Sequence, residues 1–263
     1  MASACLGVGK GSGIQPYSYD NRVPRFLPIN GPNLFLTFAS SPADSCLFPK
    51  NGDGPYRLCR ICGILLAMDE PYRIARSPDL MTPGDTALLV VDVQEKLVPA
   101  LAGSARVVWN ARRLIDGARV LGVPVVATEQ YPQGLGRTVP ELAQRLGEIP
   151  SKQTFSCGGC PAAMEELRRR AISKVLVCGI EAHVCVQQTV LDLLADGWRI
   201  YVAVDAIGSR FEVDYQTALR RMDSAGATLT TTEAALFEWC QVAGTPEFKE
   251  ISRLAREAGP ATC

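Results

Sequence analysis

The stretch VLVCGIEAHVCVQQTVLDLL, residues 175–194, changes its hydrophobic pattern at Gly179. Up to that glycine the residues form an unbroken apolar run, which is typical of a strand buried on both faces of a sheet. Beyond it, apolar residues recur at helical spacing, so the pattern predicts a helix with Cys185 near its first turn. Parallel sheets carry their functional sites at the carboxyl ends of strands. The stretch therefore predicts a strand–turn–helix unit whose cysteine is either a nucleophile or a small apolar residue of the core.

The same alternation of apolar runs and helical patterns extends along the chain from residue 84 onward. Ser104 is the expected N-cap of the first helix, and Gly197 is expected to close the third. Because the strands are unbroken apolar runs, the predicted fold class is α/β: a three-layer α/β/α, Rossmann-like domain with a mainly parallel sheet. Strands are predicted over 86–92, 123–130, 174–180, 199–206 and 227–231, and helices over 104–122, 160–173, 184–197, 212–226, 232–241 and 247–258.

Composition argues against several classes of protein. Of the 263 residues, 47% are hydrophobic, which is enough to bury a sizeable core. A formal net charge of zero argues against binding nucleic acid through broad electrostatic attraction. No apolar run approaches the length of a membrane span, and the N-terminus lacks the pattern of a secretory signal. The ten cysteines are scattered rather than arranged as a dense framework, so a cytoplasmic protein with mostly reduced thiols is expected.

Residues 1–80 differ from the rest of the chain. They hold clusters of Gly, Pro, Ser and Asn, and no helical or strand period lasts there. Three interpretations stay open for this extension: a poorly ordered segment, a weak targeting segment, or a region outside the natural translation product. Organellar targeting is therefore not excluded. Met81 opens the regular part, so the predicted organisation is an extension over 1–80 and a compact α/β domain over 81–263.

Three residues at or beyond predicted strand ends have the chemistry of a reactive site. Asp92 ends the first strand, Lys152 lies in a polar loop, and Cys185 lies at a helix start where backbone N–H groups favour a thiolate. Each has a bland alternative: a loop-anchoring aspartate, a solvated lysine and a buried cysteine. Together they match the general base, charge partner and nucleophile of a cysteine hydrolase. His183, the only histidine, is two residues from Cys185 and is expected to point elsewhere, which disfavours a Cys/His pair.

These residues resemble the isochorismatase-like cysteine hydrolase family over about residues 84 to 245. The resemblance implies the isochorismatase-like hydrolase fold, with Asp92 as general base, Lys152 as charge-stabilising partner and Cys185 as nucleophile. It also implies a cis peptide bond between Ile180 and Glu181, and an oxyanion hole made by the backbone N–H groups of Glu181 and Cys185. The motifs that carry the family resemblance are LLVVDVQEKL, SKQTFS and CGIEAHVCV, and TEQYPQGLGRTVPEL, VDAIGSR and FKEISRL are closer still to the isochorismatase domain-containing proteins.

Departures from related enzymes narrow the expected reaction. Isochorismatases that cleave a vinyl ether lack the cysteine, so Cys185 favours acyl chemistry on an amide-like or related carbonyl of a small molecule. The loop TEQYPQG contains no histidine where nicotinamidases carry metal ligands, so neither a catalytic metal nor another cofactor is expected. Gln130 and Tyr131 in that loop are candidates for lining the substrate pocket. The resemblance implies a homo-oligomer, with residues 234–244 as a candidate contact face, and neither nucleic acid nor membrane is an expected partner.

Three other functions remain open. The domain could be a binding or regulatory module that keeps the pocket and turns nothing over. The Cys157–Cys160 pair could make it a redox module. The Cys59–Cys62 and Cys157–Cys160 pairs could also form a zinc site, although their separation is far longer than usual.

Overall fold

The computed structural model describes residues 56–58, 65–67, 74–168 and 172–260, and the chain divides into two units, Met1–Ala75 and Arg76–Cys263. In the first unit, the strands β1 (Tyr56–Leu58) and β2 (Leu65–Ala67) form an antiparallel pair. The rest of the predicted extension lies almost entirely outside the described residues. The second unit begins before Met81 because the Arg76 guanidinium donates to the carbonyl oxygens of Met81 and Glu238, at 3.2 and 2.9 Å.

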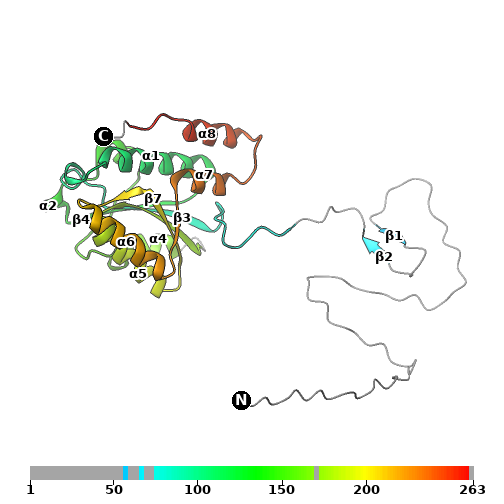
Figure 1. Ribbon diagram of the computed structural model, residues 1–263, viewed down its shortest axis with the longest axis horizontal. Coiled ribbons are helices and arrows are strands. Elements are labelled where there is room, and N and C mark those ends of the chain that lie inside the picture. Colours follow the sequence, from blue (N-terminus) through cyan, green and yellow to red (C-terminus); the bar gives the residue numbers. More distant parts are fainter. Residues whose placement is uncertain (1–55, 59–64, 68–73, 169–171, 261–263) are drawn as a thin grey trace, which may run out of the picture. The chain divides into compact units, whose positions relative to one another are not determined.

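The second unit is built on a six-stranded parallel sheet with the strand order β5-β4-β3-β6-β7-β8 (Figure 1). Every neighbouring pair in it is parallel, which confirms the predicted three-layer α/β class. The strands are β3 (Thr86–Val91), β4 (Val125–Gln130), β5 (Ser151–Lys152), β6 (Lys174–Ile180), β7 (Arg199–Gly208) and β8 (Thr228–Thr230).

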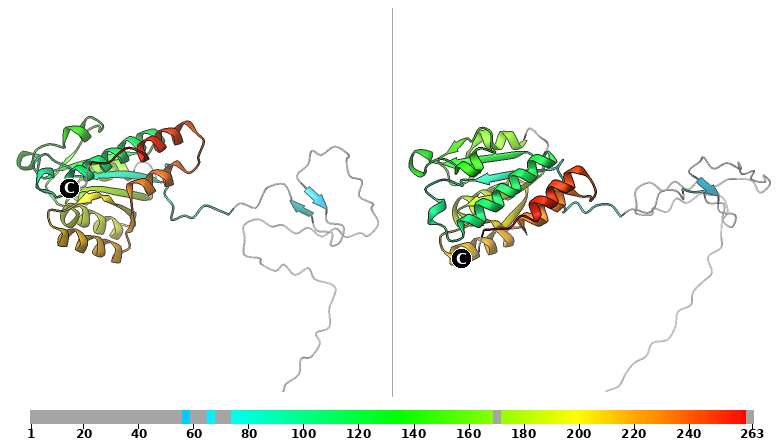
Figure 2. Two further views of the ribbon diagram at one scale, coloured as in Figure 1. Left: turned by 45° about the horizontal axis from the view of Figure 1, so that its top comes forward. Right: turned by 90° about the horizontal axis from the view of Figure 1, so that it is seen from above.

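Helices cover both faces of this sheet (Figure 2). One face carries α1 (Ser104–Leu121), α7 (Thr232–Cys240) and α8 (Pro246–Ala255). The other carries α4 (Pro161–Arg168), α5 (Gln187–Ala195) and α6 (Glu212–Ser224). Short elements complete the unit: the 3₁₀ turns η1 (Val98–Ala100) and η2 (Cys157–Gly159), the π turn η3 (Ala182–Val186), and the helices α2 (Pro132–Leu135) and α3 (Pro140–Ala143).

Alternate residues of each strand enter the two cores, as the period of two requires. In β3, Leu88 and Val90 pack on the α1 side, whereas Leu89 and Val91 pack on the α5 side, and all are buried. This explains why the strands are continuous apolar runs in the sequence. None of the helices among the described residues is long and apolar enough to cross a membrane.

Two local expectations need correction. Ser104 is the first residue of α1 rather than its cap, because Gly103 takes the cap position in a left-handed conformation with φ 70°. The helix predicted over 184–197 is preceded by the π turn η3, so Cys185 lies in that turn and α5 begins only at Gln187. Gly197 follows the end of α5 with φ 89°, in agreement with its predicted role.

Gly179 is required by the close approach of β6 to β3. Its φ is 123°, and a Cβ atom at this position would lie 2.0 Å from the carbonyl oxygen of Val91. A side chain here would push apart the two central strands just before the residues that follow them, Asp92 and Glu181.

Candidate active site

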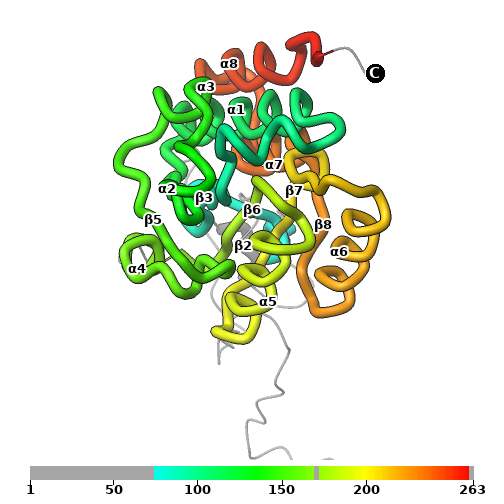
Figure 3. The backbone as a smooth tube through the Cα atoms, turned by 90° about the vertical axis from the view of Figure 1, so that its left-hand side faces the viewer, coloured from blue at the N-terminus to red at the C-terminus, as the bar shows by residue number. Residues whose placement is uncertain are grey.

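The predicted reactive residues gather at the carboxyl edge of the sheet. Figure 3 shows the side of the unit on which α2, β5 and α5 surround the ends of the central strands. Asp92 directly follows β3, Lys152 ends β5, and Cys185 lies in the turn after β6. Lys152 pairs with Gln130 in the β4–β5 ladder, so its position is set by the short edge strand. The sheet topology thus brings together residues that are far apart in the chain.

Asp92 and Lys152 form an ion pair that is completely buried. The Nζ atom of Lys152 lies 2.6 Å from Oδ2 of Asp92, and both side chains are 0% exposed. Asp92 has a positive φ of 51°, and its backbone N–H donates to the Thr128 carbonyl at 3.2 Å. Burying two charges costs several kcal/mol per ion, so such a pair is a weak source of stability. The presence of this costly ion pair at the carboxyl end of β3 favours a chemical role for it.

The Lys152 ammonium is surrounded by oxygen atoms. Besides Asp92, it donates to Oε1 of Gln130 at 2.8 Å and to the carbonyls of Phe155 at 2.8 Å and Thr154 at 3.2 Å. The Gln130 side chain, predicted to line the pocket, is therefore engaged with the lysine and is only 6% exposed. Tyr131, its predicted companion, is 48% exposed and takes the N-cap position of α2, directly after β4.

Cys185 is a buried thiol rather than a solvent-exposed one. The residue is 5% exposed, and its carbonyl accepts a hydrogen bond from Thr189 Oγ1 at 2.6 Å. Burial and the negative charge of Asp92 raise the pKa of the Cys185 thiol well above its usual range, and the Lys152 ammonium only partly offsets them. Burial and the nearby Asp92 carboxylate therefore oppose the thiolate that was expected at a helix start.

The turn around Cys185 has the predicted peptide geometry. The Ile180–Glu181 bond is cis, and the Glu181 carbonyl accepts from the N–H groups of Val184 and Val186. The Glu181 carboxylate is held by the Arg210 guanidinium at 3.0 Å.

The side chain of His183, the only histidine of the chain, is engaged outside the Asp92–Lys152 pair. Its Nδ1 lies 3.0 Å from the Ser209 hydroxyl, and its Nε2 lies 3.8 Å from the Asp214 carboxylate. The imidazole thus faces Ser209, directly after β7, and Asp214 of α6, in agreement with the expectation that it does not pair with Cys185.

A family model described as the isochorismatase domain matches residues 86–234, which is more than half of the chain. The chain belongs to the isochorismatase family. This isochorismatase-family chain is 44% identical over 179 residues to isochorismatase domain-containing protein 2 of Homo sapiens, covering 68% of this chain and 86% of that protein. The corresponding protein of Danio rerio is 39% identical over 183 residues, covering 70% and 92%.

Solved structures agree with this family assignment. The MAR1 ribonuclease of Caenorhabditis elegans is 41% identical, with a TM-score of 0.65 over 69% of this chain and 95% of that one. The YcaC protein of Escherichia coli, described as an octameric hydrolase of unknown specificity, is 22% identical, with a TM-score of 0.58 over 64% and 85%. At this identity YcaC shows the shared fold alone.

The isochorismatase-family site also includes residues that the sequence did not single out. Thr128 of β4 donates its hydroxyl to Oδ1 of Asp92 at 2.8 Å, and Thr189 of α5 accepts from the Cys157 backbone N–H at 2.9 Å. Thr189 thereby joins the turns that hold Cys157 and Cys185. The only signal for Thr128 was a polar residue at an inward position of an apolar strand.

Of the two cysteine pairs considered for a zinc or redox site, only Cys157–Cys160 lies within the described residues. Cys157 and Cys160 are free, buried thiols, while Cys59 and Cys62 lie outside the described residues. Within the described residues, no group of three or more His, Cys, Asp or Glu side chains is placed to hold a metal ion.

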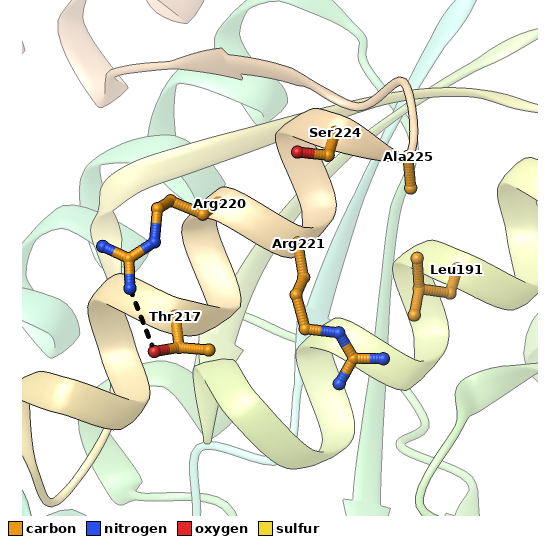
Figure 4. A pocket seen from close by; sticks show the side chains of 6 residues that line it. All are labelled: Leu191, Thr217, Arg220, Arg221, Ser224 and Ala225. Carbon is orange, nitrogen blue, oxygen red and sulfur yellow. Dashed lines mark hydrogen bonds between the residues drawn. The ribbon is translucent and has the colours of Figure 1, made fainter.

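Away from the Asp92–Lys152 pair, α5 and α6 border a surface pocket of about 450 Å³ (Figure 4). Its side chains include Leu191, Arg220 and Arg221, and the Arg220 guanidinium turns back to the Thr217 hydroxyl at 3.2 Å. None of the predicted reactive residues lines this pocket.

Proposed function

We propose that this chain is a metal-independent cysteine hydrolase that acts on an amide-like or related carbonyl of a small molecule. The observation that carries the proposal is the fully buried Asp92–Lys152 pair, which acts electrostatically on the buried thiol of Cys185. A carboxylate near a protonated thiol is poised to act as a general base, and an adjacent ammonium keeps that carboxylate ionised. Family membership is consistent with hydrolysis, and the specific roles and the substrate class are our proposal.

In the acylation step, Asp92 takes the thiol proton while the sulfur of Cys185 attacks the substrate carbonyl carbon. The new S–C bond converts the carbonyl into an oxyanion, which we assign to the backbone N–H groups of Glu181 and Cys185. Collapse of this intermediate breaks the bond to the leaving group. Asp92 returns its proton to the departing amine or alkoxide, which leaves a thioester on Cys185.

In the deacylation step, Asp92 removes a proton from water, and the resulting hydroxide attacks the thioester. The C–S bond breaks, the carboxylic acid leaves, and the cysteine sulfur recovers the proton from Asp92. The base is thus restored, and the net reaction consumes one water molecule. The Lys152 ammonium compensates the charge of Asp92 in both steps.

Access to the sulfur favours a small substrate. Cys185 is 5% exposed, so only a slender carbonyl-bearing group reaches it. Tyr131 is the better of the two predicted pocket residues because its side chain is about half exposed, whereas Gln130 is occupied by Lys152. If Tyr131→Ala and Gln130→Ala both retain full activity, neither residue contacts the substrate.

The name of one relative raises a second class of substrate. The similar Caenorhabditis elegans structure is called a ribonuclease. A phosphodiester backbone is bulky and highly charged, whereas this chain has zero formal net charge and a cysteine that is nearly inaccessible. These features favour acyl chemistry, and an RNA arm in the activity screen tests the other class directly.

The decisive experiment is a turnover screen on the full chain with small amides, esters and an RNA oligonucleotide. We expect carbonyl cleavage that is lost in Cys185→Ala and retained in Cys178→Ala. The control residue is also a fully buried thiol, but it packs on the opposite face of the sheet. An acyl adduct on the peptide that contains Cys185 identifies the nucleophile.

Three other outcomes contradict the proposal. Turnover that survives in Cys185→Ala removes the nucleophile assignment, and cleavage of RNA alone favours the second class. Binding of carbonyl compounds without any turnover identifies a non-catalytic module.

Self-association and location are part of the proposal as well. YcaC is described as octameric, and we propose that this chain also forms a homo-oligomer. The scattered cysteines of the sequence are the support for proposing a location in the cytoplasm. The predicted contact face over 234–244 is largely used inside the subunit, because Leu236 and Trp239 are buried while Phe237 and Val242 are exposed. Light scattering on the purified chain measures the stoichiometry, and a monomer at micromolar concentration contradicts the expectation.

A further inference from the structure

Thr128 occupies a position between the candidate general base and a second buried thiol. It lies in β4, pairs with Val91 in the ladder to β3, and is 1% exposed. Its Oγ1 is 2.8 Å from Oδ1 of Asp92 and 3.4 Å from Sγ of Cys157. The two oxygens of the Asp92 carboxylate therefore have different partners, a hydroxyl on Oδ1 and the Lys152 ammonium on Oδ2.

Counting protons fixes the direction of these bonds. An ionised carboxylate only accepts hydrogen bonds, so the single proton of the Thr128 hydroxyl is donated to Asp92. Thr128 has no second proton for sulfur, and the contact with Cys157 is therefore an S–H group donating to Oγ1. Burial and the negative charge of Asp92 raise the pKa of the Cys157 thiol to about 11, which agrees with a protonated donor. Two consecutive hydrogen bonds therefore run from Cys157 through Thr128 to Asp92.

We propose that Thr128 is a positioning residue for the general base: its hydroxyl holds one oxygen of Asp92 while Lys152 holds the other, and together they fix the plane of the carboxylate. This inference rests on the proposed function and deepens it. With two of about four lone-pair positions occupied, the remaining ones have defined directions for taking a proton from Cys185. The Thr128 hydroxyl is buried and already has Asp92 and Cys157 as partners, so we assign its effect to the positioning of Asp92.

The proposal predicts a change in pH dependence. Three charged or titratable groups of the described residues interact with the Asp92 carboxylate. They are Lys152 from β5, Cys157 from η2 and Cys185 from η3. Because the Thr128 hydroxyl stabilises the ionised carboxylate, its loss favours uptake of a proton by Asp92. A reaction that needs ionised Asp92 then falls off at a higher pH, by roughly 1 pH unit for the loss of one hydrogen bond to a charged group.

The test uses acylation by p-nitrophenyl acetate, an activated ester whose small acetyl group suits the narrow access to Cys185. Release of p-nitrophenol is recorded from pH 4 to pH 9 on the full chain, and the rate that remains in Cys185→Ala is subtracted. We expect Thr128→Val to move the acid limb of the Cys185-dependent rate upward by about 1 pH unit and to lower the plateau about tenfold. Thr128→Ser keeps the hydroxyl and is expected to restore both the limb and the plateau.

Thr232→Val is the matched control. Thr232 is 0% exposed and donates its hydroxyl to Oδ1 of Asp205 at 3.0 Å, so its loss removes the same kind of buried bond elsewhere. This variant is expected to lose stability and to keep the wild-type pH profile. If Thr128→Val does not fold, Thr128→Ala is measured against Thr232→Ala.

Each outcome separates the two ideas. An unchanged acid limb in the Thr128 variants, or a valine variant that the serine variant does not rescue, overturns the positioning role. A p-nitrophenyl acetate rate that is the same in Cys185→Ala and Asp92→Asn as in the wild type overturns the proposed function itself.

Discussion

Replacing Lys152 by methionine should cost far more stability than the same change at another buried lysine. Methionine keeps the length of the side chain and removes the ammonium, which leaves the Asp92 carboxylate without its charge partner. Both side chains of the Lys152–Asp92 pair are 0% exposed, so water cannot replace the lost interaction. Breaking one partner of such a pair costs about 3–5 kcal/mol, which lowers the melting temperature of a domain of this size by roughly 6–20 °C.

Lys174 provides the comparison. Its Nζ lies 2.7 Å from Asp85, as close as in the Lys152 pair, but the Asp85 side chain is 32% exposed. Without the ammonium Asp85 remains hydrated, so Lys174→Met is expected to cost only about 1–2 kcal/mol. The double variant Lys152→Met with Asp92→Asn removes both charges and is expected to recover much of the loss, because no buried charge is left unpaired.

The assay is thermal and urea unfolding of the three variants and the wild type at pH 7 and pH 5. The loss in Lys152→Met should shrink at pH 5, since an unpaired Asp92 escapes its penalty by taking up a proton. The reasoning is refuted if Lys152→Met and Lys174→Met melt together, or if the double variant is no more stable than the single one.

Three further predictions concern the base, an acid-sensitive ion pair and the central strands. In Asp92→Asn, the flat neutral part of the rate of acylation by p-nitrophenyl acetate should become a rate that rises with pH, because the thiol must then ionise without a base; a retained neutral plateau contradicts the base role. At Asp85, burial opposes ionisation, but Lys174 and the nearby threonines outweigh it and hold the pKa at about 2. Because this pKa is lowered, the stabilisation of the fold by ionised Asp85 is complete above about pH 4 and is lost as the pH falls toward 2. The unfolding free energies of the wild type and Asp85→Asn should therefore converge over that range, and parallel curves contradict the assignment. Gly179→Ala should yield little folded protein because its Cβ meets a backbone oxygen at 2.0 Å. Gly197→Ala, with nothing within 4 Å of its Cβ, should cost only about 1–2 kcal/mol of stability. Similar soluble yields of the two variants contradict the close approach of β6 to β3.

The sheet was predictable because its strands are buried on both faces. Most residues that face either core are apolar, so β3 and β6 contain continuous apolar runs with clear ends in the sequence. The position of Asp92 and Cys185 beyond those ends followed directly. The start of α1 was predicted one residue late because Ser104 is a good cap by residue type, while the chain enters the helix through the left-handed Gly103.

The chemical state of the site was harder to predict. Whether Cys185 is a thiol or a thiolate depends on its burial and on its distances from the Asp92 carboxylate and the Lys152 ammonium. The local spacing of residues in the sequence determines neither the burial nor these distances. Likewise, a threonine in a strand is ordinary β-sheet composition, so the hydrogen bond from Thr128 to Asp92 follows only from the three-dimensional placement of β4 beside Asp92. The π turn at residues 182–186 also has no simple periodic signature.

The ammonium of Lys152 has more acceptors than protons. Four oxygen atoms lie within 3.2 Å of Nζ, and only three N–H bonds are available to share among them. When Asp92 becomes neutral by taking the thiol proton in the proposed reaction, its attraction for the ammonium weakens. The N–H groups of Lys152 would then donate mainly to the carbonyls of Thr154 and Phe155, which belong to the loop that follows β5. In the proposed reaction the lysine would thereby exchange partners without losing a hydrogen bond, which would couple the loop after β5 to the charge on Asp92.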